Sequence, residues 1–287
     1  MKRNIYLKTI PPAEAVARVK ASIDREALIR EETIPSHEAS GRVLAHAVHA
    51  RYSSPTFHSA AMDGYAVNAR STFAAREGHP LTLKAGETCF AVNTGHPMPE
   101  GCDAVIMIEQ VVLDGGSVTI EAPAFPWQHV RRIGEDIVAT ELLFPRNHQL
   151  RPWDVGALLS GGIWDVPVWE RVTVRIIPTG DEVLDFTTHP DPGKGQVVES
   201  NSQMLAALAR ELGCVVERAA PVPDNPEALH QALKDSLDAG RHLTIFCAGS
   251  SAGSKDFTRA TLEKEGEILT HGIAAMPGKP SLLANCR

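Results

Sequence analysis

The chain of 287 residues is long enough for two or three domains, each with its own apolar core. Hydrophobic residues make up 43% of it, but no apolar run approaches the roughly 20 residues that cross a bilayer, so we expect no membrane span. The formal net charge of −7 argues against a general nucleic-acid-binding surface, because neutralising phosphates requires a dense Lys/Arg face.

The start of the chain and its cysteines indicate a reducing compartment. The first 20 residues, "MKRNIYLKTIPPAEAVARVK", lack the apolar stretch and small-residue cleavage site of a secretory signal, so we expect a cytoplasmic protein. The five cysteines are odd in number and show no CxxC spacing, which favours reduced thiols over disulfides or a zinc site. The twelve histidines show no HExxH or HxxxH pattern, so we predict no histidine-built metal site.

The first half of the chain predicts a helix followed by short strands. Apolar residues recur at helical spacing from Pro12 to about Arg30, and the segment 40–50 alternates in the manner of a strand. The next eighty residues are short apolar runs separated by Gly, Pro and Asn, typical of a small β-rich domain. Within it, residues 102–113 predict one strand, and residues 150–162 then predict a short helix that begins at Pro152.

The second half alternates between buried strands and capped helices. This alternation predicts a parallel sheet wrapped by helices, with a ligand site beyond the carboxyl ends of the strands. Ser200 or Asn201 is expected to cap the first of these helices, and Asn225 the second. The expected strands are 171–180, 214–222 and 242–249, and the expected helices are 200–213, 225–240 and 256–266.

Acidic residues follow all three predicted strands. Asp181 and Glu182 follow the first strand, Asp224 the second and Asp256 the third, so we expect them to converge on one crevice. The loop "GSSAGS" (249–254) leads into a helix, where its backbone N–H groups could hold an anion. Carboxylates beside an anion site suit a phosphate ligand with a hard cation such as Mg²⁺.

Each of these features also has a purely structural explanation when it is taken alone. Asp256 could cap a helix, Asp224 could simply end a strand, and the loop glycines could only form a tight turn. The loop is neither a Walker A motif nor a GxGxxG fingerprint. Upstream, "RRIGEDI" could be an exposed ion-pair cluster, and Thr94 of "NTG" could be a turn residue.

Eight segments in order resemble the signatures of the molybdopterin molybdenumtransferase family, which includes the E domain of gephyrin. The resemblance extends from about Ser53 to Pro280. The segments are "SAAMDGYAV", "TGHPMPEGCDAVIMIE", "VRRIGEDI", "LRPWDVGALLSGGIWDVPVW", "IIPTGDEV", "ESNSQML", "AGSSAGSKDF" and "MPGKP".

The resemblance implies an elongated α/β multidomain protein. It implies a helical connecting and dimerisation domain formed by residues 1–50 together with 131–170, and an inserted β-rich domain at 51–130. Residues 171–287 would form a doubly wound α/β domain of the molybdopterin-binding type.

The resemblance also implies a reaction in molybdenum cofactor synthesis. A family member takes adenylylated molybdopterin and molybdate as substrates, releases AMP and leaves molybdenum on the pterin dithiolene, with Mg²⁺ as the expected metal. It implies a homodimer as well, and an upstream molybdopterin adenylyltransferase as a partner that supplies the substrate. Because the pterin supplies the sulfur chemistry, no catalytic cysteine is required.

Residue-by-residue matching to the family implies roles for ten side chains or loop positions. The catalytic residues it implies are Asp63, Thr94, Asp136 and Glu182. The substrate-binding residues it implies are Asp224, Gly249, Ser250, Ser251, Asp256 and Lys279. Glu182 and Asp256 would be the metal ligands. Asp63 would reach the active-site cleft from the β-rich domain, from the partner subunit.

Three departures from the family pattern leave an alternative open. The chain has "AGSSAG" where the family has "GGVSVG", and Met276 where the family has a basic residue. It also stops soon after "PGKP", so we expect a C-terminally truncated chain. The alternative is a non-catalytic sensor or scaffold module that binds molybdopterin. A pyrophosphatase or amidase that shares only the α/β domain is disfavoured, because the first 170 residues also match.

Overall fold

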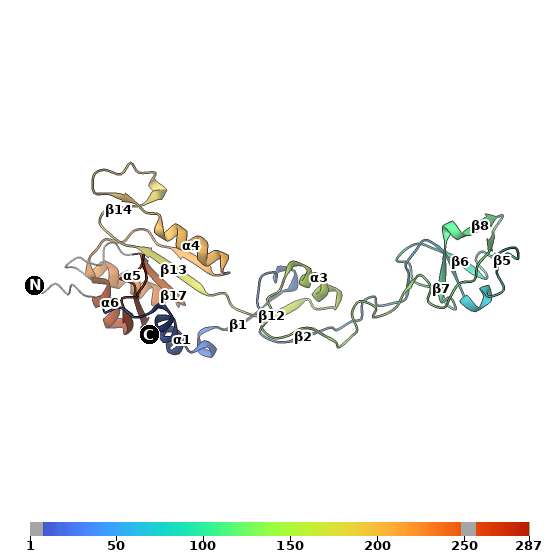
Figure 1. Cartoon of the computed structure of the whole chain (residues 1–287), viewed down its shortest axis with the longest axis horizontal. Coiled ribbons are helices and arrows are strands. Elements are labelled where there is room, and N and C mark those ends of the chain that lie inside the picture. The colour runs from blue at the N-terminus through green and yellow to red at the C-terminus, as the bar shows by residue number, and fades with distance from the viewer. Residues whose placement is uncertain (1–7, 248–256, 287) are drawn as a thin grey trace, which may run out of the picture. The chain divides into compact units, whose positions relative to one another are not determined.

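The computed structural model describes residues 8–247 and 257–286, and Figure 1 shows its helices and strands. The chain forms two compact units. Residues 1–31 and 169–287 form the first, here called the α/β unit, and residues 32–168 form the second, the β-rich unit. Over the described ranges, no helix combines the length and the apolar character needed to cross a bilayer.

A three-stranded parallel sheet forms the centre of the α/β unit. Strand β13 (Thr173–Pro178) lies between β16 (Val215–Arg218) and β17 (Leu243–Cys247). Ile176 is paired with Arg218 on one side and with Ile245 on the other. Because these strands run in the same direction, the segments that follow β13 and β16 leave the sheet at one edge.

Helices cover both faces of this sheet. On one face, Val174 and Ile176 pack against Ala206 of helix α4 (Asn201–Glu211), and all three side chains are buried. On the other face, Thr244 of β17 makes a 2.5 Å hydrogen bond to Ser236 of helix α5 (Pro226–Asp238). The α/β class predicted from the sequence is therefore confirmed.

The N-terminal helix packs against a hairpin formed by the last strands of the same unit. Arg18 of α1 donates a 2.8 Å hydrogen bond to the carbonyl of Leu269, and Asn285 donates one of 2.9 Å to the carbonyl of Ser22. The elements concerned are α1 (Pro12–Ser22), α6 (Phe257–Glu265), β18 (Gly266–His271) and β19 (Leu282–Cys286). The remaining elements of this unit are α2 (Arg25–Leu28), β14 (Val183–Leu184), η4 (Phe186–Thr188) and β15 (Val197–Val198).

Two antiparallel three-stranded sheets account for much of the β-rich unit. One has the order β6-β4-β7 and the other the order β5-β9-β8. Strand β4 is buried on both faces, since Val67 belongs to one apolar cluster and Ala66 to another. The strands are β4 (Gly64–Val67), β5 (Leu81–Lys84), β6 (Cys89–Val92), β7 (Ala104–Met107), β8 (Val111–Asp114) and β9 (Ser117–Ile120).

Three strand pairs and helix α3 complete the β-rich unit. The pairs are β1 with β12, β2 with β11 and β3 with β10. Leu44, Leu150 and Leu158 form part of a fully buried apolar cluster. The elements are β1 (Glu31–Pro35), η1 (Ser36–Glu38), β2 (Val48–His49), β3 (Ser59–Ala60), η2 (Ala69–Thr72), η3 (Ile108–Gln110), β10 (Val130–Arg131), β11 (Leu142–Phe144), α3 (Pro152–Ser160) and β12 (Asp165–Trp169).

Several helix boundaries match their local signals, and one does not. Pro152 begins α3, and the side chain of Asn225 caps α5 by accepting from the amide of Ala228, as predicted. The single helix predicted from Pro12 to Arg30 is wrong, because Ile23 is extended and Asp24 accepts from the amide of Ala27 to begin a second helix. Helix α4 begins at Asn201 with Ser200 as its N-cap residue, as predicted, although the side chain that accepts from the amide of Ser202 is that of Glu199.

Two predicted strands are also wrong in extent. Within residues 40–50 only β2 is a strand, and adjacent residues Leu44 and Ala45 are both buried, so the segment does not alternate between two faces. Residues 102–113 do not form one strand, because η3 separates β7 from β8 and the two strands join different sheets.

Gly64 is required at its position in β4 by the neighbouring strand. A Cβ atom at Gly64 would lie 2.0 Å from the carbonyl oxygen of Ile106 in β7. We expect Gly64→Ala to lower the free energy of unfolding of the β-rich unit by about 1–3 kcal/mol, because the strands would have to separate. Urea unfolding followed by tryptophan fluorescence measures this change.

Gly156 provides a matched control in the same unit. It lies in helix α3, and a Cβ atom there would meet nothing within 4 Å. Gly156→Ala should raise the free energy of unfolding by about 1 kcal/mol, as expected for a helical glycine. Equal effects of the two substitutions would contradict the close approach of β4 and β7.

Candidate functional site

Three loops of the β-rich unit are tied side by side around strand β3. The amide of Gly95 donates to the carbonyl of Ala60, and the amide of Ala61 donates to the carbonyl of His129, each at 2.8 Å. Strand β10 pairs with β3, so Arg131 lies opposite Ser59. The loops that carry Asp63, Thr94 and Asp136 therefore all border strand β3 or its partner strand β10.

Thr94 holds Asp63 through one carboxylate oxygen. The backbone N–H of Thr94 donates to Asp63 Oδ1 at 2.7 Å, and its hydroxyl donates to the same oxygen at 3.0 Å. These two donors lower the pKa of Asp63, with the backbone N–H having the larger effect. Asp63 is exposed, so it presents an ionised carboxylate to solvent at neutral pH.

Asp136 is held by a cation from the same segment. Arg131 donates to both carboxylate oxygens of Asp136 and also pairs with Glu135 at 3.7 Å. Asp136 and Arg131 are both about half exposed on their side chains. The ion-pair cluster that "RRIGEDI" could form is therefore present, and it orients the carboxylate of Asp136.

In the α/β unit, Glu182 and Asp224 follow strands of the parallel sheet. The amide of Gly180 donates to the carbonyl of Val222 at 3.2 Å, and the amide of Asp224 donates to the carboxylate of Asp181 at 3.1 Å. These two bonds join the segment after β13 to the segment after β16. Glu182 and Asp224 are both exposed, on neighbouring segments at the carboxyl edge of the sheet.

The backbone at Gly180 allows the Glu182 side chain to fold back. Gly180 has φ of +134°, and a Cβ atom there would lie 2.9 Å from Glu182 Oε2. Any residue with a Cβ atom at position 180 would have a strained backbone and would clash with the carboxylate of Glu182.

Of the other predicted site residues, only Lys279 lies among the described residues. Lys279 is exposed in the connection between β18 and β19, where its carbonyl accepts from the amide of Ile273. Gly249, Ser250, Ser251 and Asp256 lie outside the described residues. The structure thus joins Asp63 with Thr94, and Glu182 with the segment of Asp224, and the rest of the set stays a prediction.

The described side chains could supply a single ligand to a hard cation, but not a complete metal site. Across residues 8–247 and 257–286, no three His, Cys, Asp or Glu side chains form a group that could hold a metal ion. Mg²⁺ commonly uses one or two carboxylates, water and substrate phosphate, so the exposed carboxylate of Glu182 fits as a single protein ligand. All five cysteines are free, as predicted, and burial raises the pKa of Cys247 at the end of β17 to about 11.

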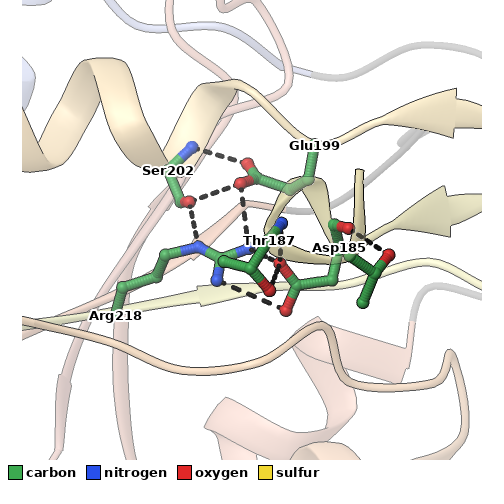
Figure 2. A network of polar contacts seen from close by, with 6 residues as sticks. Asp185, Thr187, Glu199, Ser202 and Arg218 are labelled. Atoms are coloured by element: carbon green, nitrogen blue, oxygen red, sulfur yellow. Dashed lines mark hydrogen bonds and ion pairs between the residues drawn. The ribbon is translucent and has the colours of Figure 1, made fainter. Parts of the chain in front are cut away.

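One buried ion-pair network was missed by the sequence analysis. Arg218, at the end of β16, contacts Asp185, Glu199 and Ser202, and Figure 2 shows these side chains pointing toward one another. A signal was available, because "CVVERAAPV" places two adjacent charged residues, Glu217 and Arg218, in a strand that is otherwise apolar. A charged residue in such a strand requires a partner when its side chain is buried.

The contact between Thr94 and Asp63 can be tested through the acidity of Asp63. Thr94→Ala removes the hydroxyl donor but keeps the amide donor, so the pKa of Asp63 should rise part of the way toward its ordinary value. The wild-type carboxylate therefore stays ionised at lower pH than the variant carboxylate. An NMR titration of the labelled Asp63 carboxyl carbon measures the change.

Thr94→Ser is the matched control, because serine keeps both donors. Its Asp63 pKa should equal that of the wild type. If the alanine variant titrates like the serine variant, the hydroxyl contact does not act on Asp63.

Family models match both parts of the chain. The model described as "MoeA N-terminal region (domain I and II)" matches residues 10–162, and the one described as "Probable molybdopterin binding domain" matches residues 175–287. Among solved structures, a molybdopterin biosynthesis moeA protein from Pyrococcus horikoshii has a TM-score of 0.77 at 26% identity. That match covers 98% of this chain and 73% of the other.

Curated relatives carry the name molybdopterin molybdenumtransferase. The relative from Synechococcus elongatus is 31% identical over 88% of this chain and 67% of its own length. The relative from Haemophilus influenzae is 33% identical over 87% of this chain and 64% of its own length. The chain thus spans about two thirds of the length of these relatives, and it belongs to the molybdopterin molybdenumtransferase family.

Proposed function

We propose that the chain acts in molybdenum cofactor biosynthesis and inserts molybdenum from molybdate into adenylylated molybdopterin with release of AMP. The observation that carries the proposal is the match of both family models, in order, to a chain whose Asp63 and Glu182 are exposed and anchored. The curated relatives named molybdopterin molybdenumtransferase support the same reaction.

The residues of the chain would act on the bond between AMP and the pterin phosphate. Asp63, held ionised by Thr94, would accept a proton or hydrogen bond from the substrate. Asp136, oriented by Arg131, would line the same cleft. Asp224 would bind the nucleotide, Lys279 would offset phosphate charge, and Gly249, Ser250 and Ser251 would contact the pterin.

Magnesium is part of the proposal. Glu182 and Asp256 would hold the ion, and Mg²⁺ would offset the charge that develops on the phosphate oxygens as AMP leaves. Glu182 is exposed at the carboxyl edge of the sheet, where a phosphate ligand can approach it.

The cellular setting is also proposed from the family. The chain would work in the cytoplasm as an elongated homodimer, and a molybdopterin adenylyltransferase would supply its substrate. Residues 51–130 would be an inserted domain, with 1–50 and 131–170 as the connecting domain and 171–287 as the doubly wound α/β domain. A dimer would let Asp63 of one subunit serve the α/β domain of the other.

A second candidate is a module that binds molybdopterin without turnover. Met276 favours it, because its side chain is 87% exposed where the family pattern has a basic residue. Such a module would bind adenylylated molybdopterin but leave AMP attached to the pterin.

AMP release separates the two candidates. The purified chain is mixed with adenylylated molybdopterin, with and without molybdate and Mg²⁺, and AMP is quantified by chromatography. We expect AMP release that requires both molybdate and Mg²⁺. Tight binding of the adenylylated pterin without AMP release would favour the binding module.

Substitution of the anchored acids tests their roles. Asp63→Asn and Glu182→Gln should each lower the rate of AMP release by about 100-fold or more, the range typical of lost acid–base or charge stabilisation. Glu87→Gln is the control, since Glu87 is an exposed acid of the β-rich unit that pairs only at the surface with Lys84. Unchanged rates in both test variants would overturn the site assignment.

A further inference from the structure

Glu182 lies in the segment between β13 and α4. Within this segment, strands β14 and β15 pair with each other as a short parallel ladder. The segment leaves β13 at Pro178 and reaches α4 at Asn201. The amide of Val197 donates to the carbonyl of Glu182, and the amide of Glu199 donates to the carbonyl of Leu184, each at 3.0 Å. The place of Glu182 therefore depends on strands β14 and β15, which have only two residues each.

Arg218 connects this ladder to the central sheet. Its Nε donates to Ser202 Oγ at 2.9 Å, and its terminal nitrogens donate to Asp185 at 3.1 and 3.5 Å. One of these nitrogens also donates to Glu199 Oε2 at 3.4 Å (Figure 2). Asp185 follows β14 directly and Glu199 follows β15 directly, so one guanidinium contacts both strands of the ladder.

The network is largely withdrawn from water. The side chain of Arg218 is 13% exposed and that of Glu199 is 4% exposed, and the guanidinium also lies over the ring of Phe186 at 4.6 Å. Without Arg218, the carboxylates of Asp185 and Glu199 would share this space with no cation between them. A buried charge that loses its partner is strongly unfavourable, so the ladder would open.

We propose that Arg218 is a positioning residue for Glu182. It acts by holding β14 and β15 against β16, and not by touching the substrate. This inference rests on the proposed function, which gives Glu182 a role in the reaction. A lysine cannot fully replace Arg218, because an ammonium group lacks the planar guanidinium that bonds to Ser202, Asp185 and Glu199 at the same time.

Hydrogen–deuterium exchange tests the structural half of this proposal without any substrate. In Arg218→Gln, the amides of Val197 and Glu199 should exchange at least about tenfold faster, since their bonds belong to the ladder. The amides of α5 should be unchanged. Arg218→Lys should give an intermediate result.

Arg241→Gln is the matched control. Arg241 pairs at 2.6 Å with Glu217, the residue next to Arg218 on β16, whereas Asp185 and Glu199 pair with Arg218. Loss of Arg241 should leave exchange in 183–199 unchanged. If Arg218→Gln unfolds the whole unit, Asp185→Asn is the variant to use instead. This substitution weakens the contact between Arg218 and the residue after β14, and Glu199 still accepts from the amide of Ser202.

Steady-state AMP release then tests the link to Glu182. Arg218→Gln should lower kcat by about tenfold or more with KM changed by less than about threefold, as expected when a reacting group is displaced but substrate contacts remain. Arg241→Gln should retain wild-type values of both constants.

The outcomes separate this inference from the proposed function. No AMP release by the wild-type chain would count against the proposed function, and exchange alone would then decide whether Arg218 holds the ladder. Unchanged exchange in Arg218→Gln would overturn the inference whatever the activity. Faster exchange with an unchanged kcat would also overturn it, since Arg218 would then be structural only.

Discussion

Strand β13 is hydrogen-bonded along both edges to parallel neighbours, and the candidate site of the α/β unit depends on this pairing. The register places Ile176 beside Arg218 and Pro178 beside Cys247. Because the strands are parallel, the segments after β13 and β16 leave at the same edge, where Gly180 bonds to Val222. The acids that follow the strands reach a common edge for this reason.

Asp63 and Glu182, one candidate acid in each unit, are both anchored by their neighbours. Both are exposed, but Asp63 is anchored through its carboxylate and Glu182 through its backbone. Asp63 is held by the amide and hydroxyl of Thr94 on a neighbouring loop, and Glu182 sits between the Gly180 turn and the ladder secured by Arg218. Anchoring of either kind reduces the freedom that the acid loses when a ligand binds, and such preorganisation favours catalysis.

The sequence predicted the features that are encoded locally. Strands and helices of the α/β unit follow from apolar runs and from caps such as Asn225 with Pro226, because these signals lie within a few residues. The mostly apolar segment from 102 to 113 misled the prediction, since the change of sheet at η3 is set by pairing with β4 and β9. Local patterns carry no information about such partners.

The candidate site was predictable in its residue types but not in its contacts. Thr94 and Asp63 are 31 residues apart, and Arg218 and Asp185 are 33 apart, so neither pair can be inferred from spacing. The start of α4 shows the same limit, because the side chain that accepts from the amide of Ser202 is that of Glu199, which also contacts Arg218, 19 residues away. Tertiary packing decides which of several adjacent polar residues makes the bond.

The most direct test of this account follows molybdenum itself. After the purified chain has reacted with adenylylated molybdopterin, molybdate and Mg²⁺, the pterin is isolated and its bound molybdenum is counted by mass spectrometry beside the AMP in the same sample. The account predicts one molybdenum on the pterin dithiolene for each AMP released. AMP release that leaves the pterin free of molybdenum would contradict it and indicate a pyrophosphatase.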